Sequence, residues 1–276
     1  AGMGHTGPWC DHVTYADAVA ALAGLTAEAG FPGRDPVGIP FGLGDMIAGA
    51  HAALATLAAL ESRDATGRGQ HIDLSQVEAV ASHTGTSVLE VTAGRPRPPL
   101  PGNRHPGMAP HGVFPCRGED RWCAIAVETE AQWAALCRVM DDPGLAGDSG
   151  FATLEARKTN EDALEARVAA WTRRHDGETI MVTLEAAGIA AGVVQDGRDL
   201  VEGDPHLRAR RFYETVAHPR VGPFPHEGVV ARLGATPGGV WHAAPLLGEH
   251  TREILEGLLG LGAGEIDRYA ADGVLE

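Results

Sequence analysis

The chain has 276 residues, enough for one or two domains with a hydrophobic core. Apolar residues make up 44% of it and charged residues only 21%, a composition that excludes an intrinsically disordered chain. It carries 37 acidic and 22 basic side chains, for a net charge of −15 at pH 7. Since nucleic-acid binding needs clustered Lys and Arg, this charge argues against nucleic acid as a partner. Small anionic ligands, which respond to local fields, are not excluded.

The beginning of the chain and its longest apolar run bear on its organisation. The first residues read AGMGHTGPW, a glycine-rich stretch without an initiator Met or the apolar region of a signal peptide. We therefore expect a piece of a longer protein. Residues 46–60 form the longest apolar run, which is shorter than the roughly 20 residues of a membrane span. This run predicts a buried helix and no membrane contact.

The cysteines indicate the compartment. They stand at irregular spacing, at Cys10, Cys116, Cys123 and Cys137. Without a secretory signal, this spacing is typical of reduced thiols and predicts a cytoplasmic protein. His105 and His111 with Cys116 and Cys123 could supply zinc ligands by residue type. No CxxC or HxxxH spacing supports such a site, so we expect no metal.

The first hundred residues predict helices and short strands separated by glycine turns. In chain order we expect a helix at 15–25, a short strand at 37–43, a helix at 46–63, a short strand at 71–74 and a helix from 76 to 92. Ser75 and Glu78 have the spacing of a capping box, which starts the last of these helices. The following segment, residues 95–102 (RPRPPLPG), is too rich in proline for a helix and predicts a stiff extended linker.

The rest of the chain predicts a second unit of mixed helices and strands. Two strands at 112–116 and 122–127 should form a hairpin. We expect helices at 130–140, 160–175, 178–187, 248–259 and 265–271, and a strand at 190–195. Residues 212–217 and 229–233 are predicted to pair as antiparallel strands.

Asp45 is the first candidate functional residue. It lies between the glycine pair at 42 and 44 and the start of an apolar helix. One interpretation is a helix N-cap, whose carboxylate accepts backbone N–H bonds. The other is an ionised nucleophile, stabilised by the positive helix end and reachable because glycine permits close approach. Position alone leaves both open.

Residues 102–112 (GNRHPGMAPHG) form the second candidate segment. Three glycines and two prolines predict an irregular loop. The loop is either an interdomain connection or a lid whose backbone N–H groups meet a developing oxyanion or an anionic ligand.

Four short strings carry a resemblance to a known family. They are Gly44-Asp45, residues 66–70 (TGRGQ), residues 102–106 (GNRHP) and residues 244–251 (APLLGEHT). In this order they resemble the family III CoA-transferases, of the CaiB/BaiF or formyl-CoA transferase type, whose relatives include α-methylacyl-CoA racemase. The resemblance covers essentially the whole chain, but the N-terminal part of the family is missing.

The resemblance implies an α/β fold with a Rossmann-like large domain and a small α+β domain joined by linkers. Residues 1–75 would be the C-terminal part of the large CoA-binding domain, and 76–111 a linker helix and Pro/Gly loop. Residues 112–197 would form the small domain, and 198–276 the return linker and C-terminal segment of the large domain. Family members form interlocked homodimers, so we expect a homodimer here.

By the same resemblance, Asp45 is the expected nucleophile of an acyl-CoA:carboxylate CoA-transferase. Its carboxylate would attack the thioester to give an aspartyl mixed anhydride and then an aspartyl-CoA thioester. The coenzyme A thioester is the substrate, no cofactor is bound permanently, and the partners are an acyl-CoA and a carboxylic acid. Residues expected to contact CoA or the acyl group are His12, Tyr15, Gly102, Asn103, Arg104, His105, Gly107 and Met108.

Two alternatives remain open. The first is a racemase-like isomerase, for which the family's proton-transferring His falls near Tyr15. A neutral Tyr is a poor base at pH 7, although His12 is close by in sequence. The second is a non-catalytic, truncated piece of the same fold. Ala16 stands where some transferases carry an acidic residue, so that supporting role is unassigned.

Overall fold

The computed structural model describes residues 1–39, 41–95 and 99–275. The chain divides into two compact units, Ala1–Val194 and Gln195–Glu276. This boundary lies close to the expected end of the small domain at residue 197. The expected division of the first unit at residues 75 and 111 stays a prediction.

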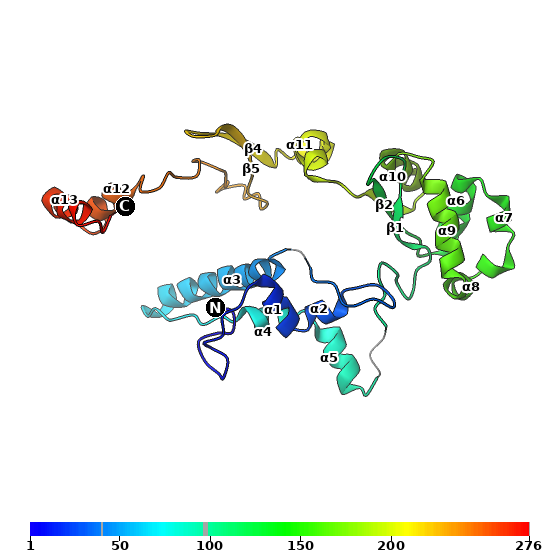
Figure 1. Ribbon diagram of the computed structural model, residues 1–276, viewed down its shortest axis with the longest axis horizontal. Coiled ribbons are helices and arrows are strands. Elements are labelled where there is room, and N and C mark those ends of the chain that lie inside the picture. Colours follow the sequence, from blue (N-terminus) through cyan, green and yellow to red (C-terminus); the bar gives the residue numbers. More distant parts are fainter. Residues whose placement is uncertain (40, 96–98, 276) are drawn as a thin grey trace. The chain divides into compact units, whose positions relative to one another are not determined.

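The first part of unit 1 is helical (Figure 1). Its helices are α1 (Ala16–Leu22), α2 (Leu25–Glu28), α3 (Leu43–Thr66), α4 (Gln76–Ala81) and α5 (Gly85–Thr92). Helix α1 confirms the expected helix at 15–25. Gly24, with a φ of +84°, separates it from α2, which was not predicted. The expected helix 76–92 is two helices, α4 and α5. The Ser75 hydroxyl accepts the backbone N–H of Glu78, as the capping-box spacing predicts.

The expected strands at 37–43 and 71–74 are absent from the described residues of these segments. Residues 73–77 instead bond to the chain's first residues. The N–H groups of Gln76 and Val77 donate to the carbonyls of Ala1 and Gly2, and the Asp73 carboxylate accepts the N–H of His5. Residue 40 lies outside the described residues, as do 96–98 of the expected proline-rich linker.

Helix α3 matches the helix expected at 46–63, but the expectation that this helix is buried is wrong. Only Gly44 and Ala48 are buried, whereas Leu54 and Leu57 are 68% and 65% exposed. Since α3 contacts α1 and α4 near its N-terminus, the described residues leave its later turns uncovered. By length and composition α3 could cross a membrane, contrary to the expectation from residues 46–60 alone. One such helix is weak evidence for a span, because core helices of soluble proteins have the same composition.

The second part of unit 1 contains a three-stranded antiparallel sheet in the order β1-β2-β3. The strands are β1 (His111–Pro115), β2 (Trp122–Ala126) and β3 (Ala190–Val193). The helices are α6 (Glu130–Met140), α7 (Pro143–Ala146), α8 (Leu154–Thr159), α9 (Glu161–Thr172) and α10 (Gly177–Ala186), with a short 3-10 turn η1 (Ser149–Phe151). The expected hairpin, third strand and three long helices are therefore confirmed. Helices α7 and α8 were not predicted.

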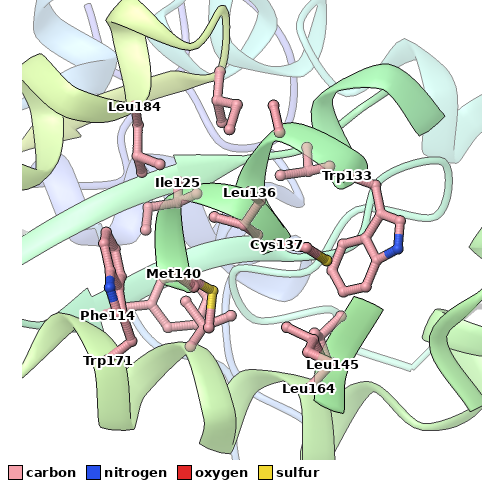
Figure 2. Close-up of a cluster of buried hydrophobic side chains, with 14 of the residues drawn as sticks. Phe114, Ile125, Trp133, Leu136, Cys137, Met140, Leu145, Leu164, Trp171 and Leu184 are labelled. Atoms are coloured by element: carbon pink, nitrogen blue, oxygen red, sulfur yellow. The ribbon is translucent and has the colours of Figure 1, made fainter. Parts of the chain in front are cut away.

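The main hydrophobic core lies between this sheet and helices α6, α9 and α10. Figure 2 shows Phe114 and Ile125 of the sheet together with Leu136 of α6, Trp171 of α9 and Leu184 of α10. Leu136 and Leu184 have no exposed surface. The alternating burial of β2 explains the packing, because every second side chain points into this core.

Arg157 of α8 is a fully buried charged side chain beside this core. Its guanidinium forms a bidentate ion pair with Glu130, with N–O distances of 2.7 and 3.0 Å, and lies 4.8 Å from the Trp133 ring centre. It also donates to the carbonyls of Ala109 and Phe151, at 3.0 and 3.3 Å. A buried cation needs such a set of partners, because leaving it unpaired is strongly unfavourable.

Unit 2 holds a two-stranded antiparallel sheet and short helices. Its elements are a π-helical turn η2 (Asp199–Gly203), α11 (Pro205–Ala209), β4 (Tyr213–His218), β5 (Gly222–Glu227), α12 (Thr251–Gly257) and α13 (Ala263–Ala271). The predicted pairing of 212–217 with 229–233 is wrong in its second strand. β4 turns directly back into β5, with His218 paired to Gly222. The two prolines of β5 are tolerated because the strand is an edge.

The ion pair between Glu130 and Arg157 predicts a pH dependence. Hydrogen bonds from Arg157 lower the pKa of Glu130 below its usual range. The stabilisation is therefore fully present above the unfolded-state pKa of about 4.3, and is lost as pH falls through the lower folded value. We expect Glu130→Gln to be less stable than the wild type at about pH 6, and to lose less stability between there and about pH 3.

Urea denaturation followed by circular dichroism at both pH values measures this difference. Other carboxylates, such as Asp176 beside Arg117, also have a lowered pKa. Their protonation in acid should lower the stability of the variant and of the wild type equally. Equal losses of stability in the variant and the wild type would contradict a role for the Glu130 ion pair.

Candidate functional site

Asp45 lies in the first turn of α3, after the N-cap residue Gly42. It is therefore not the N-cap, and the first of its two interpretations is wrong. The side chain is exposed, and its Oδ1 accepts a hydrogen bond from Nε2 of Gln76, the first residue of α4. A carboxylate in this turn is stabilised by the positive end of the helix. The arrangement thus presents an exposed carboxylate with one oxygen oriented by Gln76.

Two glycines allow this arrangement at the start of α3. A Cβ atom at Gly42 would lie 2.6 Å from Oδ2 of Asp45, so a side chain there would displace the carboxylate. A Cβ atom at Gly44 would lie 3.0 Å from Cγ1 of Val19 in α1 and 3.4 Å from Cγ2 of Val80 in α4. Gly44 therefore permits both helices to close on α3, and α4 brings Gln76 to Asp45.

The sequence-predicted residues His12 and Tyr15 lie just before and at the start of α1. Tyr15 is the N-cap residue of α1 and is 80% exposed. The exposed His12 ring contacts Trp9 edge-on, with 5.9 Å between ring centres. The backbone N–H of His12 donates to the Trp9 carbonyl. No hydrogen bond between either side chain and Asp45 is seen among the described residues.

The candidate loop begins at Gly102, which touches the turn after α2. Gly102 has a φ of +62°, and its N–H donates to the carbonyl of Gly30 at 2.9 Å. A Cβ atom at Gly102 would lie 2.9 Å from the Phe31 ring. Both the backbone conformation and this close approach require glycine.

Arg104 is occupied by carboxylates of α9. It forms ion pairs with Glu161, Asp162 and Glu165, the last through two hydrogen bonds of 2.9 and 2.6 Å. The hydrogen bond to Glu165 is the main cause that raises the pKa of Arg104 above its usual value. This guanidinium therefore anchors the loop to α9 in the structure.

The backbone N–H groups of the next residues also have acceptors. Gly107 donates to Nδ1 of His105 at 3.1 Å, and Met108 donates to the His105 carbonyl at 3.4 Å. The Asn103 carbonyl lies 2.6 Å from Nδ1 of His111. In this conformation, Gly107 and Met108 could not offer their N–H groups to an oxyanion without breaking these bonds.

A hollow of about 480 Å³ lies beside the loop and the sheet. Asn103, Arg104 and His111 line it, together with small residues of all three strands such as Ala124 and Gly192. The described residues place this hollow, the loop and Asp45 in unit 1, but no hydrogen bond or ion pair among them joins Asp45 to residues 102–108. The nucleophile candidate and the loop are thus two pieces, each held by its own contacts.

Sequence reasoning missed the residues that hold these pieces. The sequence predicted Gln76 only as the first residue of the helix at 76–92, although its side chain orients Asp45. Three further side chains of α8 and α9 contact the loop or its partners: Arg157, Lys158 and Glu161. They were missed because a run of charges in a helix is typical of a solvent-exposed face. A buried arginine leaves no clear periodic signal, since the pattern marks apolar residues.

The cysteines expected to be reduced are free thiols in the described chain. Burial raises the pKa of Cys116, Cys123 and Cys137, that of Cys123 to about 11. Buried, protonated thiols are poor nucleophiles and poor metal ligands. Among the described residues no group of three or more His, Cys, Asp or Glu side chains is arranged to hold a metal ion.

The mixed helix-and-strand fold matches that of a CaiB/BaiF family protein. A crystal structure of such a protein from Brucella suis superimposes with a TM-score of 0.83 at 27% identity, covering 94% of this chain and 66% of the other. The family model for CoA-transferase family III matches residues 1–251. The chain belongs to this family, as the motifs predicted.

Two curated relatives illustrate the likeness. Succinyl-CoA–D-citramalate CoA-transferase of Chloroflexus aurantiacus is 33% identical over 274 residues, which are 99% of this chain and 68% of that protein. A probable CoA-transferase of Mycobacterium tuberculosis is 32% identical over 99% of this chain and 35% of its own length. The chain thus spans between about a third and two thirds of the length of these relatives.

The close packing at Gly44 predicts opposite effects of two alanine substitutions in α3. Gly49→Ala meets open space and should stabilise the helix by about 1 kcal/mol. Gly44→Ala places its Cβ against Val19 and Val80, so we expect its free energy of unfolding to lie at least about 1 kcal/mol below that of Gly49→Ala. Chemical denaturation measures both. Equal stability of the two variants would show that α1 and α4 can move apart at no cost.

Proposed function

We propose that the chain carries the nucleophile of an acyl-CoA:carboxylate CoA-transferase, and that Asp45 is that nucleophile. The observation that carries the proposal is the Asp45 carboxylate, placed at the N-terminus of α3 and hydrogen-bonded to Gln76 in a member of CoA-transferase family III. The chain covers only part of the length of its relatives. The activity is therefore proposed for the whole native protein.

In the proposed reaction, an Asp45 oxygen attacks the thioester carbonyl of the donor acyl-CoA and CoA leaves as its thiolate. The thiolate then attacks the Asp45 carbonyl of the mixed anhydride, which gives an aspartyl-CoA thioester and releases the donor acid. The acceptor carboxylate attacks this thioester and again expels CoA thiolate. The thiolate attacks the acceptor's acyl carbon, which yields the new acyl-CoA and restores the Asp45 carboxylate.

A carboxylate is a weak nucleophile, so the reaction needs a fixed geometry and donors for the oxyanion. Gln76 supports the first need, because its bond to one Asp45 oxygen leaves the other to attack. For the second we propose the loop 102–108, in particular the N–H groups of Asn103 and His105. Those of Gly107 and Met108 already have acceptors. Arg104 then holds the loop through its carboxylate partners, and its contact with CoA stays a prediction.

The substrates we propose are short-chain carboxylic acids and their CoA thioesters. Curated relatives are named for succinyl-CoA with D-citramalate, succinyl-CoA with mesaconate, and formyl-CoA with oxalate. His12, Tyr15 and Met108 stay predicted contacts of CoA or the acyl group. The homodimer and the cytoplasmic location stay parts of the proposal.

The direct test is Asp45→Ala in the native protein, with Asp64→Ala as the matched control. Asp64 lies on the same helix, is exposed and pairs with its neighbour Arg63. We expect Asp45→Ala to lower the rate of CoA transfer from succinyl-CoA to short dicarboxylates by at least about a thousandfold. Asp64→Ala should keep the wild-type rate. Transfer that survives in Asp45→Ala would refute the assignment.

Turnover in deuterated water separates transfer from the racemase alternative. A transferase moves CoA without breaking the C–H bond next to the thioester, so the product acyl-CoA should contain no deuterium at that carbon. Mass spectrometry of the product measures it. Deuterium at the α-carbon without exchange of CoA between acids would contradict the transferase proposal.

A further inference from the structure

Two neighbouring cations of α8 donate to the backbone of the candidate loop. Arg157 donates from Nε to the carbonyl of Ala109 at 3.0 Å, and Lys158 donates from Nζ to the carbonyl of His105 at 3.0 Å. The two acceptors lie on either side of Gly107 and Met108. The middle of the loop is therefore tied at both ends to a single helix.

Each cation is itself held by a carboxylate. Glu130 pairs with Arg157, and both oxygens of Glu161 lie 2.7 Å from Nζ of Lys158. The Glu161 side chain is only 7% exposed, and its Oε2 also lies 3.6 Å from Nε of Arg104. Glu161 thus links Arg104, at the start of the loop, to Lys158, which binds the loop at the His105 carbonyl.

These contacts do more than fill the core. Apolar side chains of similar volume often stabilise a protein as well as a buried ion pair does, so stability alone does not account for the buried charges of Arg157 and Glu161. Here the two cations donate hydrogen bonds to two loop carbonyls. Removing Arg157 would leave the carbonyl of the buried Ala109 without its hydrogen-bond donor. The geometry that they specify is that of residues 103–110.

We propose that Arg157, Lys158 and Glu161, the loop clamp, are positioning residues that hold residues 103–110 in the conformation that meets the acyl-CoA. The inference rests on the proposed function, in which this loop supplies N–H donors to the oxyanion. None of the three residues touches the substrate. They act by fixing His105 and Ala109, and with them the part of the loop that carries the N–H groups of Asn103 and His105.

The first arm of the test is hydrogen exchange, which needs no activity. Lys158→Met keeps the length of the side chain and removes the bond to the His105 carbonyl. We expect the amides of Gly107 and Met108 to exchange about fivefold faster, the effect of losing one hydrogen bond, with Ile125 and Leu136 unchanged. Arg117→Met is the matched control, because it breaks the exposed pair with Asp176 in the same part of the fold.

The second arm is steady-state kinetics of the native protein. A loop that is less well placed should slow the chemical steps more than it weakens CoA binding. We expect Lys158→Met and Glu161→Gln to lower kcat about tenfold or more while KM for acyl-CoA changes less than about threefold. Lys158→Arg should restore most of kcat, and Arg117→Met should leave both parameters unchanged.

Each result decides the proposal. Unchanged exchange of Gly107 and Met108 would overturn the clamp, and so would faster exchange with an unchanged kcat. Equal acceleration at Ile125 and Leu136 would also overturn it, because that pattern marks general destabilisation. If the wild type shows no CoA transfer, the proposed function fails on its own. Faster exchange confined to the loop then still supports the clamp, and unchanged exchange rejects it.

Discussion

The close approach of three helices at Gly44 is the constraint on which the candidate site depends. With no side chain at this position, Val19 of α1 and Val80 of α4 pack against the first turn of α3. This contact places Gln76, at the start of α4, beside the Asp45 carboxylate. The apolar packing therefore determines the orientation of a polar group on the surface. A nucleophile that is oriented before the substrate arrives has less entropy to lose in the reaction.

The loop is positioned by a different force, the attraction between charges. Arg104 binds three carboxylates of α9, and the cations of α8 bind the carbonyls of His105 and Ala109. In a chain of net charge −15, these cations are paired with carboxylates and loop carbonyls of the same chain. That pairing explains why the net charge predicts little about the site. Packing fixes Asp45, and ion pairs fix the loop that we propose to complete its chemistry.

Local signals in the sequence predicted much of the fold. The β1–β2 hairpin and α6 follow from alternation, turn residues and helical periodicity, which act over a few residues. The pairing of β4 was mispredicted, because the prolines of β5 concealed an edge strand. Of the candidate site, the sequence indicated Asp45 and the loop but not Gln76 or Arg157. Their contacts join residues that are 31 and 48 positions apart, a separation that periodicity does not report.

The most direct test of the central claim is the fate of oxygen during turnover. In the proposed reaction, an oxygen of the acceptor carboxylate remains on Asp45 after each cycle, because CoA thiolate attacks the acceptor's acyl carbon. Native protein that has turned over with an acceptor labelled with heavy oxygen should carry the label in the peptide that contains Asp45, and fragmentation should place it on that residue. A peptide without label, or label on another carboxylate, would contradict Asp45 as the nucleophile.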